Sequence, residues 1–179
     1  AAYIRFMTAA VAWSFTFHRL ATTRGAPACR KARVNPKIPS PRAVHPGPAQ
    51  MLLTLVDATA LLWRLVLDGA DVGPRFAEVA DEWESKLDGE GGNYAFNDLH
   101  AALAFAATGR DAAMARLLQH VARVAESTGT NGAMQREVGM PLIRAIAAYG
   151  RGRFDEATDL ISPVRDIAHR FGGSHAQRD

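Results

Sequence analysis

The chain has 179 residues, of which 48% are hydrophobic and 22% are charged, as expected for one ordinary globular domain. Its single cysteine, Cys29, excludes an internal disulfide framework and suggests a reducing compartment. No group of cysteine and histidine residues has the spacing of a zinc site. We therefore expect a cytoplasmic protein without a metal or another cofactor.

The net charge of +3 is distributed unevenly along the chain. Residues 1–50 contain eight Lys or Arg and no Asp or Glu, whereas residues 51–179 contain thirteen basic and eighteen acidic residues, a balance of −5. The basic character thus belongs to the first fifty residues alone. It does not predict nucleic-acid binding by the rest of the chain.

Residues 1–20 are apolar but are interrupted by Arg5, His18 and Arg19. A membrane-spanning helix needs roughly 18 or more consecutive apolar residues, so we expect no membrane span here. The absence of acidic residues also suits an amphipathic or organelle-targeting helix, and this alternative stays open.

Six prolines between Pro27 and Pro48 predict a disordered linker over residues 21–49. The chain begins with Ala, so we expect its true start to be missing. Residues 1–49 have two interpretations, a genuine leader or an out-of-frame reading of GC-rich coding DNA, and we assign them no function.

From Gln50 onward, apolar residues recur with the helical period, and no window alternates as a half-buried strand does. Met51–Asp68 is apolar except for a narrow polar stripe, so we expect a helix that is buried on most sides. Asn93 and Asn131 are expected to cap later helices. The expected helices are Met51–Asp68, one from about Phe76 to Leu87, Tyr94–Thr108, one that begins at Asp111, one after Asn131, and one from about Phe154 to Phe171.

Short connections between helices of this length favour antiparallel neighbours, and two turns suggest a repeat. Gly152-Arg-Phe154-Asp-Glu-Ala157 fits the hairpin of a tetratricopeptide repeat, in which a glycine forms the turn, an aromatic residue fills the gap between the helices and a small alanine allows close approach. Gly109 begins a weaker copy 43 residues earlier (152 minus 109), against a standard period of ~34 residues.

Residues 50–179 also resemble the tetratricopeptide repeat protein 38 family, which implies an all-α, α–α superhelix of antiparallel helical hairpins but no settled activity. Residues 1–49 do not match that family. Its members continue beyond Asp179, so we expect this chain to be a fragment. The resembling stretches, in the order of the family, are LVDATALLWRL (55–65), DVG (71–73), YAFNDLHA (94–101), GTN (129–131), REVG (136–139) and RFGGSHAQRD (170–179).

Several polar residues are candidates for a binding site. Asn97 and His100 lie three residues apart on one helix face, with Asp98 near the helix start. They form either a recognition site or acid–base pair, or a structural arrangement in which Asp98 caps the helix and His100 is hydrogen-bonded between helices. Pro141 and Pro163 lie inside helical patterns and predict kinks, and the first of them frees the carbonyl of Glu137.

The run Gly172–Asp179 offers a second candidate site. Ser174 and Gln177 have the spacing of a capping box, and His175 and Arg178 lie at the start of the helix that this box predicts. The exposed amides of such a helix start bind anions, whereas the alternative is an ordinary turn between helices.

These observations favour a protein-interaction or scaffold module whose concave face takes a protein or peptide partner. No serine or cysteine nucleophile motif and no phosphate-binding loop is present, so we do not expect an enzyme. The alternative function is a small-molecule or enzymatic site around Asn97, His100, Glu137 and His175. Because a solenoid needs capping repeats, we expect an uncovered apolar flank of the last hairpin to self-associate.

Overall fold

The structure is a computed structural model, and it describes residues 48–173. Every regular element among these residues is helical, which confirms the predicted all-α class for this part of the chain. A π-helical segment η1 leads from α6 into α7, and a 3-10 helix η2 continues α8. The elements are α2 (Pro48–Leu67), α3 (Arg75–Glu90), α4 (Ala95–Thr108), α5 (Asp111–Ala125), α6 (Thr130–Met134), η1 (Gln135–Gly139), α7 (Met140–Gly150), α8 (Phe154–Ile161) and η2 (Ser162–Phe171).

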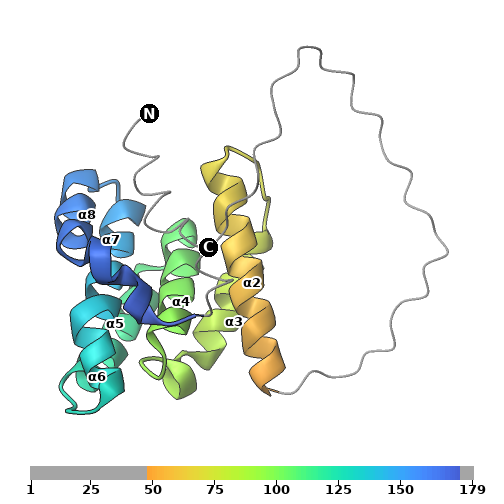
Figure 1. The fold of residues 1–179 in the computed structure, drawn as a ribbon. Coiled ribbons are helices and arrows are strands. Elements are labelled where there is room, and N and C mark those ends of the chain that lie inside the picture. Colours follow the sequence, from red (N-terminus) through yellow and green to blue (C-terminus); the bar gives the residue numbers. More distant parts are fainter. Residues whose placement is uncertain (1–47, 174–179) are drawn as a thin grey trace, which may run out of the picture.

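Successive helices pack against one another as hairpins, α2 with α3, α4 with α5, and α7 with α8. The hairpins are joined because α4 packs between α2 and α7 and also contacts α3. Helix α2 therefore lies at one edge of the array, and α7 and α8 lie at the opposite edge (Figure 1). One continuous apolar core runs through all of these elements, from Leu55 on α2 to Val164 on η2.

Two pairs of small residues set the close approach of α7 to α4. A side-chain carbon on Gly139 would lie 3.1 Å from Cβ of Ala95, and one on Gly150 would lie 2.9 Å from Cβ of Ala106. The two glycines are 11 residues apart (150 minus 139), and so are the two alanines (106 minus 95), which is about three helical turns. The two helices therefore run parallel and in register, and a glycine meets an alanine of α4 at both ends, Gly139 directly before α7 and Gly150 at its end.

The two turns that resemble each other in sequence also match in conformation. Gly109 and Gly152 have φ angles of +65° and +72°, in the left-handed region that glycine favours. The residues that follow, Arg110 and Arg153, have nearly equal backbone angles, φ −81° and ψ 68° against φ −86° and ψ 69°. Each donates its backbone N–H to the carbonyl five residues earlier, at 2.9 Å. The predicted turn similarity is therefore a structural one.

Other details of the second hairpin differ from the expectation. Ala157 is buried, so the small residue permits close helix packing as predicted. Phe154 does not fill the gap between the helices, because its side chain is 50% exposed and its ring lies against Tyr149 at a centroid distance of 5.4 Å.

The two prolines coincide with changes in helical winding. Pro141 is in the first turn of α7, directly after the π-helical segment η1, and Pro163 is in the first turn of the 3-10 helix η2. A proline removes one helical hydrogen bond and its ring excludes the carbonyl four residues earlier, so the backbone changes its winding at both places.

The predicted caps at Asn93 and Asn131 are wrong. Tyr94 precedes α4, and Gly129 precedes α6. The Asn93 amide instead donates back to the carbonyl of Gly89, and the Asn131 amide donates to the carbonyl of Gly92. Asparagine side chains bond to nearby backbone in several ways, so a position before a helix does not fix the role.

Helix α2 is less buried than the sequence predicts. Its polar stripe is solvent-facing, with Thr54, Asp57 and Asp68 exposed and Arg64 half-buried. Leu53, Leu61 and Leu65 beside this stripe are also exposed, whereas the buried side of α2 contacts α3, α4 and, through Trp63, Tyr149 of α7.

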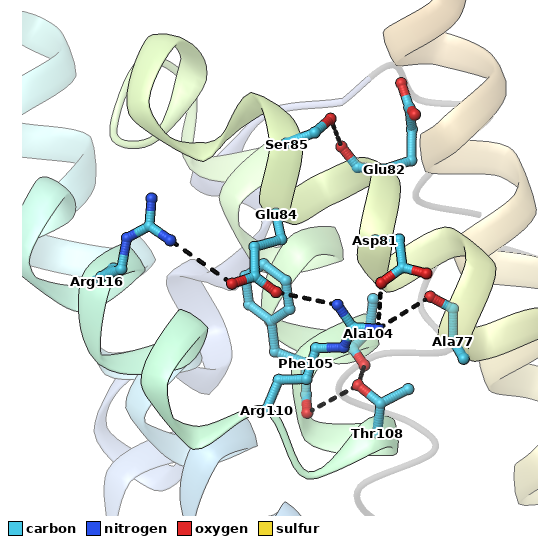
Figure 2. Close-up of polar contacts among 10 residues, drawn as sticks. All are labelled: Ala77, Asp81, Glu82, Glu84, Ser85, Ala104, Phe105, Thr108, Arg110 and Arg116. Carbon is cyan, nitrogen blue, oxygen red and sulfur yellow. Dashed lines mark hydrogen bonds and ion pairs between the residues drawn. The ribbon is translucent and has the colours of Figure 1, made fainter.

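A row of charged residues joins α3 to the second hairpin (Figure 2). The guanidinium of Arg110 bonds to Asp81 at 2.5 Å, to Glu84 at 3.0 Å and to the carbonyl of Ala77, and Arg116 bridges Glu84 and Asp88. The ion pair with Arg116 lowers the pKa of Asp88. These residues lie at the surface, so we interpret the row as an orienting contact between helices.

Candidate functional site

A buried polar network lies where the α3–α4 loop meets α6 and η1. The carboxylate of Asp98 accepts the backbone N–H of Gly92 at 2.9 Å and the side-chain amide of Gln135 at 2.6 Å. The same Gln135 amide and that of Asn131 donate to the carbonyl of Gly92, each at 3.2 Å. Both backbone groups of Gly92 are thus bonded by side chains, and the network holds the loop against α6 and η1.

Two glycines make room for this network. Gly92 has a φ of +85°, and a side-chain carbon there would lie 2.9 Å from Val124 and 3.0 Å from the carbonyl oxygen of His120. A side-chain carbon on Gly139 would overlap Oε1 of Gln135. That oxygen is buried and has no hydrogen-bond partner among the described residues. It lies against the backbone of Gly139, where only the small hydrogens of a glycine fit.

Burial determines the charge state of Asp98. Desolvation of its side chain raises the pKa of Asp98 to about 6, although the bonds from Gly92 and Gln135 act in the opposite direction. The network therefore contains a carboxyl group that titrates near neutral pH.

His100 is also buried on α4, where its ring contacts Phe96 and feels the charges of Asp57 and Arg64 on α2. Nδ1 of His100 lies 2.7 Å from the carbonyl oxygen of Phe96, so Nδ1 carries the proton and donates it. Burial lowers the pKa of His100 to about 4, against smaller effects of the Phe96 bond and of Asp57 and Arg64 on α2. The imidazole is therefore neutral at pH 7, and only 8% of the residue is exposed.

An aromatic surface covers the first turns of α4. The Phe96 ring contacts His100, with ring centroids 4.6 Å apart, and stacks on Phe171 at 5.3 Å. Tyr94 lies beside Phe96 at 6.0 Å, and its hydroxyl oxygen accepts the N–H of Gly173 at 2.7 Å. The end of η2 is therefore attached to the start of α4.

Glu137 lies next to this attachment. Its carboxylate accepts a bond from the guanidinium of Arg170 at 3.3 Å, and both side chains are more than half exposed. Glu137 and His100 do not contact each other directly. They are linked by a series of contacts: Glu137 pairs with Arg170 of η2, the next residue Phe171 stacks on Phe96 of α4, and Phe96 contacts His100.

The structure places the candidate residues in different surroundings. Asp98 and His100 contact different partners, Asp98 those in the polar network and His100 the ring and carbonyl of Phe96. Asn97 is half-buried and directly precedes Asp98. Glu137 is exposed on η1. The other candidates, Ser174, His175, Gln177 and Arg178, lie outside the described residues.

The sequence prediction missed Gln135, Gly92 and Tyr94. Gln135 is a fully buried polar residue in an otherwise apolar stripe, and the glycine four residues later is the complementary signal. Tyr94 was expected only as the first residue of a helix, but its hydroxyl group contacts the chain 79 residues later.

Among residues 48–173, no group of three or more His, Cys, Asp or Glu is arranged to hold a metal ion. Within the same range, no helix has the length and apolar character needed to cross a bilayer. No family model matches the chain, and no solved structure matches it either.

Proposed function

We propose that residues 50–179 are part of a tetratricopeptide-like α-solenoid, related to the tetratricopeptide repeat protein 38 family, that acts as a protein-interaction or scaffold module. The observation that carries this proposal is the repeated hairpin. Two turns with equal backbone geometry, 43 residues apart, each join a helix of one layer to a helix of another. The first helices of those hairpins, α4 and α7, pack parallel and in register.

A stack of hairpins presents the first helix of each on one common surface, which in solenoid proteins is the concave binding surface. Here that layer consists of α2, α4 and α7. On α7, the positions around Arg144 are buried while Arg144 itself is exposed. An exposed arginine on an otherwise buried helix suits an acidic or polar group of a peptide or helical partner.

The test is a pull-down with the full chain and two charge-reversal variants. We expect Arg144→Glu, on α7, to lose partners that the unaltered chain retains. The matched control is Glu126→Lys, an exposed charge that directly follows α5 in the other layer, and it is expected to keep those partners. A set of partners that is unchanged by Arg144→Glu but altered by Glu126→Lys would contradict the proposed surface.

The alternative function is a small-molecule or enzymatic site around Asn97, His100, Glu137 and His175. One observation favours it. Gly173 lies against Phe96, whose ring contacts His100, so His175 follows this contact by only two residues. Against it, His100 is buried and neutral, and Glu137 is occupied by Arg170. A ligand at this site would shift the NMR signals of the His100 ring, and this experiment separates the two functions.

A further inference from the structure

The last described residues of the chain turn back across the array. From the end of α8, η2 passes over η1 and reaches the first turn of α4, where Gly173 ends beside Tyr94 (Figure 1). We call Ser162–Gly173 the C-terminal strap. The strap thus contacts η1, which leads into α7, and the start of α4, where it borders the layer that the proposed function assigns to a partner.

Each of the last four strap residues has its own contact. The guanidinium of Arg170 bonds to Glu137, and the Phe171 ring stacks on Phe96 with an angle of 29° between the planes. A side-chain carbon on Gly172 would overlap the side chain of Tyr94, and one on Gly173 would lie 2.7 Å from the ring of Phe96. The surface under the strap therefore fits a cation, an aromatic ring and two glycines, in that order along the chain.

The strap as a whole has few fully buried contacts. Only Val164 of η2 is buried, and the ion pair of Arg170 and Glu137 is exposed, so it contributes little to stability. The segment is also wound as a 3-10 helix of 10 residues, whereas such helices rarely exceed about 3–4 residues because their hydrogen bonds are poorer. Segments with few buried contacts detach locally at low free-energy cost.

We propose that Tyr94, Phe96 and Glu137 form a binding surface for a peptide with the pattern arginine–aromatic–glycine–glycine, and that the strap occupies this surface in cis until such a partner displaces it. The inference rests on the proposed function and adds the chemistry of the partner. Because the strap and the partner compete, the strap also sets how strongly the partner binds.

The test uses the full chain and a fluorescently labelled synthetic peptide of the strap sequence, SPVRDIAHRFGG. The unaltered chain is expected to bind it weakly, because a tethered competitor acts at an effective concentration in the millimolar range. Phe171→Ala removes the stacking contact of the strap and leaves the surface intact. We expect the dissociation constant of the peptide to fall by about tenfold or more in this variant.

A second variant guards against a loss of folding, since Phe171 is half-buried. Arg170→Glu changes an exposed residue and is expected to strengthen peptide binding in the same direction by a smaller factor. Specificity is checked by charge exchange. Glu137→Arg, combined with Phe171→Ala, should weaken binding of the peptide. Binding should return when the peptide carries glutamate at the position of Arg170.

Peptide affinity that is equal in the unaltered chain, Phe171→Ala and Arg170→Glu would overturn the proposal. So would binding that is insensitive to Glu137→Arg, or amide exchange in Ser162–Phe171 as slow as in α4. These failures would leave the proposed function in place, because its own test depends on Arg144 of α7 and on natural partners. If the peptide test failed and Arg144→Glu also left the natural partners unchanged, both the proposed function and this inference would be contradicted.

Discussion

At the scale of single residues, Asp98 and His100 are a pair of buried groups with opposite titration behaviour. They lie two residues apart on α4 but in different surroundings. Burial raises the pKa of Asp98 to about 6 and lowers the pKa of His100 to about 4. In both residues burial favours the uncharged form, so the folded state keeps a proton on the carboxyl group and withholds one from the imidazole.

The two shifts act on stability with opposite signs between pH 4 and 6.5. The folded state retains the Asp98 proton up to a pH of about 6, while the unfolded chain releases it near the ordinary aspartate pKa of 3.8, so this group lowers stability as the pH rises through that window. The unfolded chain protonates His100 below 6.5 while the folded state resists to about 4, so this group lowers stability as the pH falls.

We therefore predict opposite slopes for two variants. The free energy of unfolding of Asp98→Asn, minus that of the unaltered chain, should rise between pH 4 and pH 6 by about 2 kcal/mol. The same difference for His100→Gln should fall as the pH rises. Urea unfolding at several pH values measures both, and pH slopes of the same sign for the two variants would show that burial does not control these groups.

At the scale of elements, the structure depends on glycines that serve packing instead of flexibility. Gly150 ends α7 against Ala106 of α4, whereas Gly89 in α3 has nothing within 4 Å of the position of a side-chain carbon. We predict that Gly150→Ala destabilises the chain by about 1–3 kcal/mol through overpacking. Gly89→Ala, the matched control, should stabilise it by about 0.5–1 kcal/mol because alanine restricts the unfolded chain.

Chemical denaturation of both variants is the measurement. A stabilising effect of Gly150→Ala similar to that of Gly89→Ala would show that α4 and α7 are free to separate, and would remove the close in-register packing on which the repeat argument depends.

The elements also show how far the sequence could be interpreted. Helix positions were predictable because apolar spacing and glycine turns are local properties, and the pair at Gly109 and Gly152 is an example. The polar network was not predictable, because Gln135 reaches Gly92 and Asp98 across 43 and 37 residues of chain. The winding of η1 and η2 was only partly indicated, since a proline predicts a disturbance but not its form.

At the scale of the whole molecule, the two ends of the array differ in exposed apolar surface. Leu53, Leu61 and Leu65 are exposed on α2, at 52%, 56% and 37%. At the other end of the described array, among α7, α8 and η2, the large exposed apolar side chain is Phe154. The sequence predicted self-association through the last hairpin, whereas the described residues place more uncovered apolar surface on the first helix.

This asymmetry predicts which end controls association. If copies of the chain associate as their concentration rises, Leu61→Lys combined with Leu65→Lys should abolish it, because both side chains are exposed and the charges must then be desolvated in any contact through α2. Phe154→Ser, the control at the opposite end, should leave the association constant almost unchanged. Sedimentation velocity over a range of concentrations measures both variants. Loss of association in Phe154→Ser with full retention in the lysine variant would assign the contact to α8 and restore the expectation from the sequence.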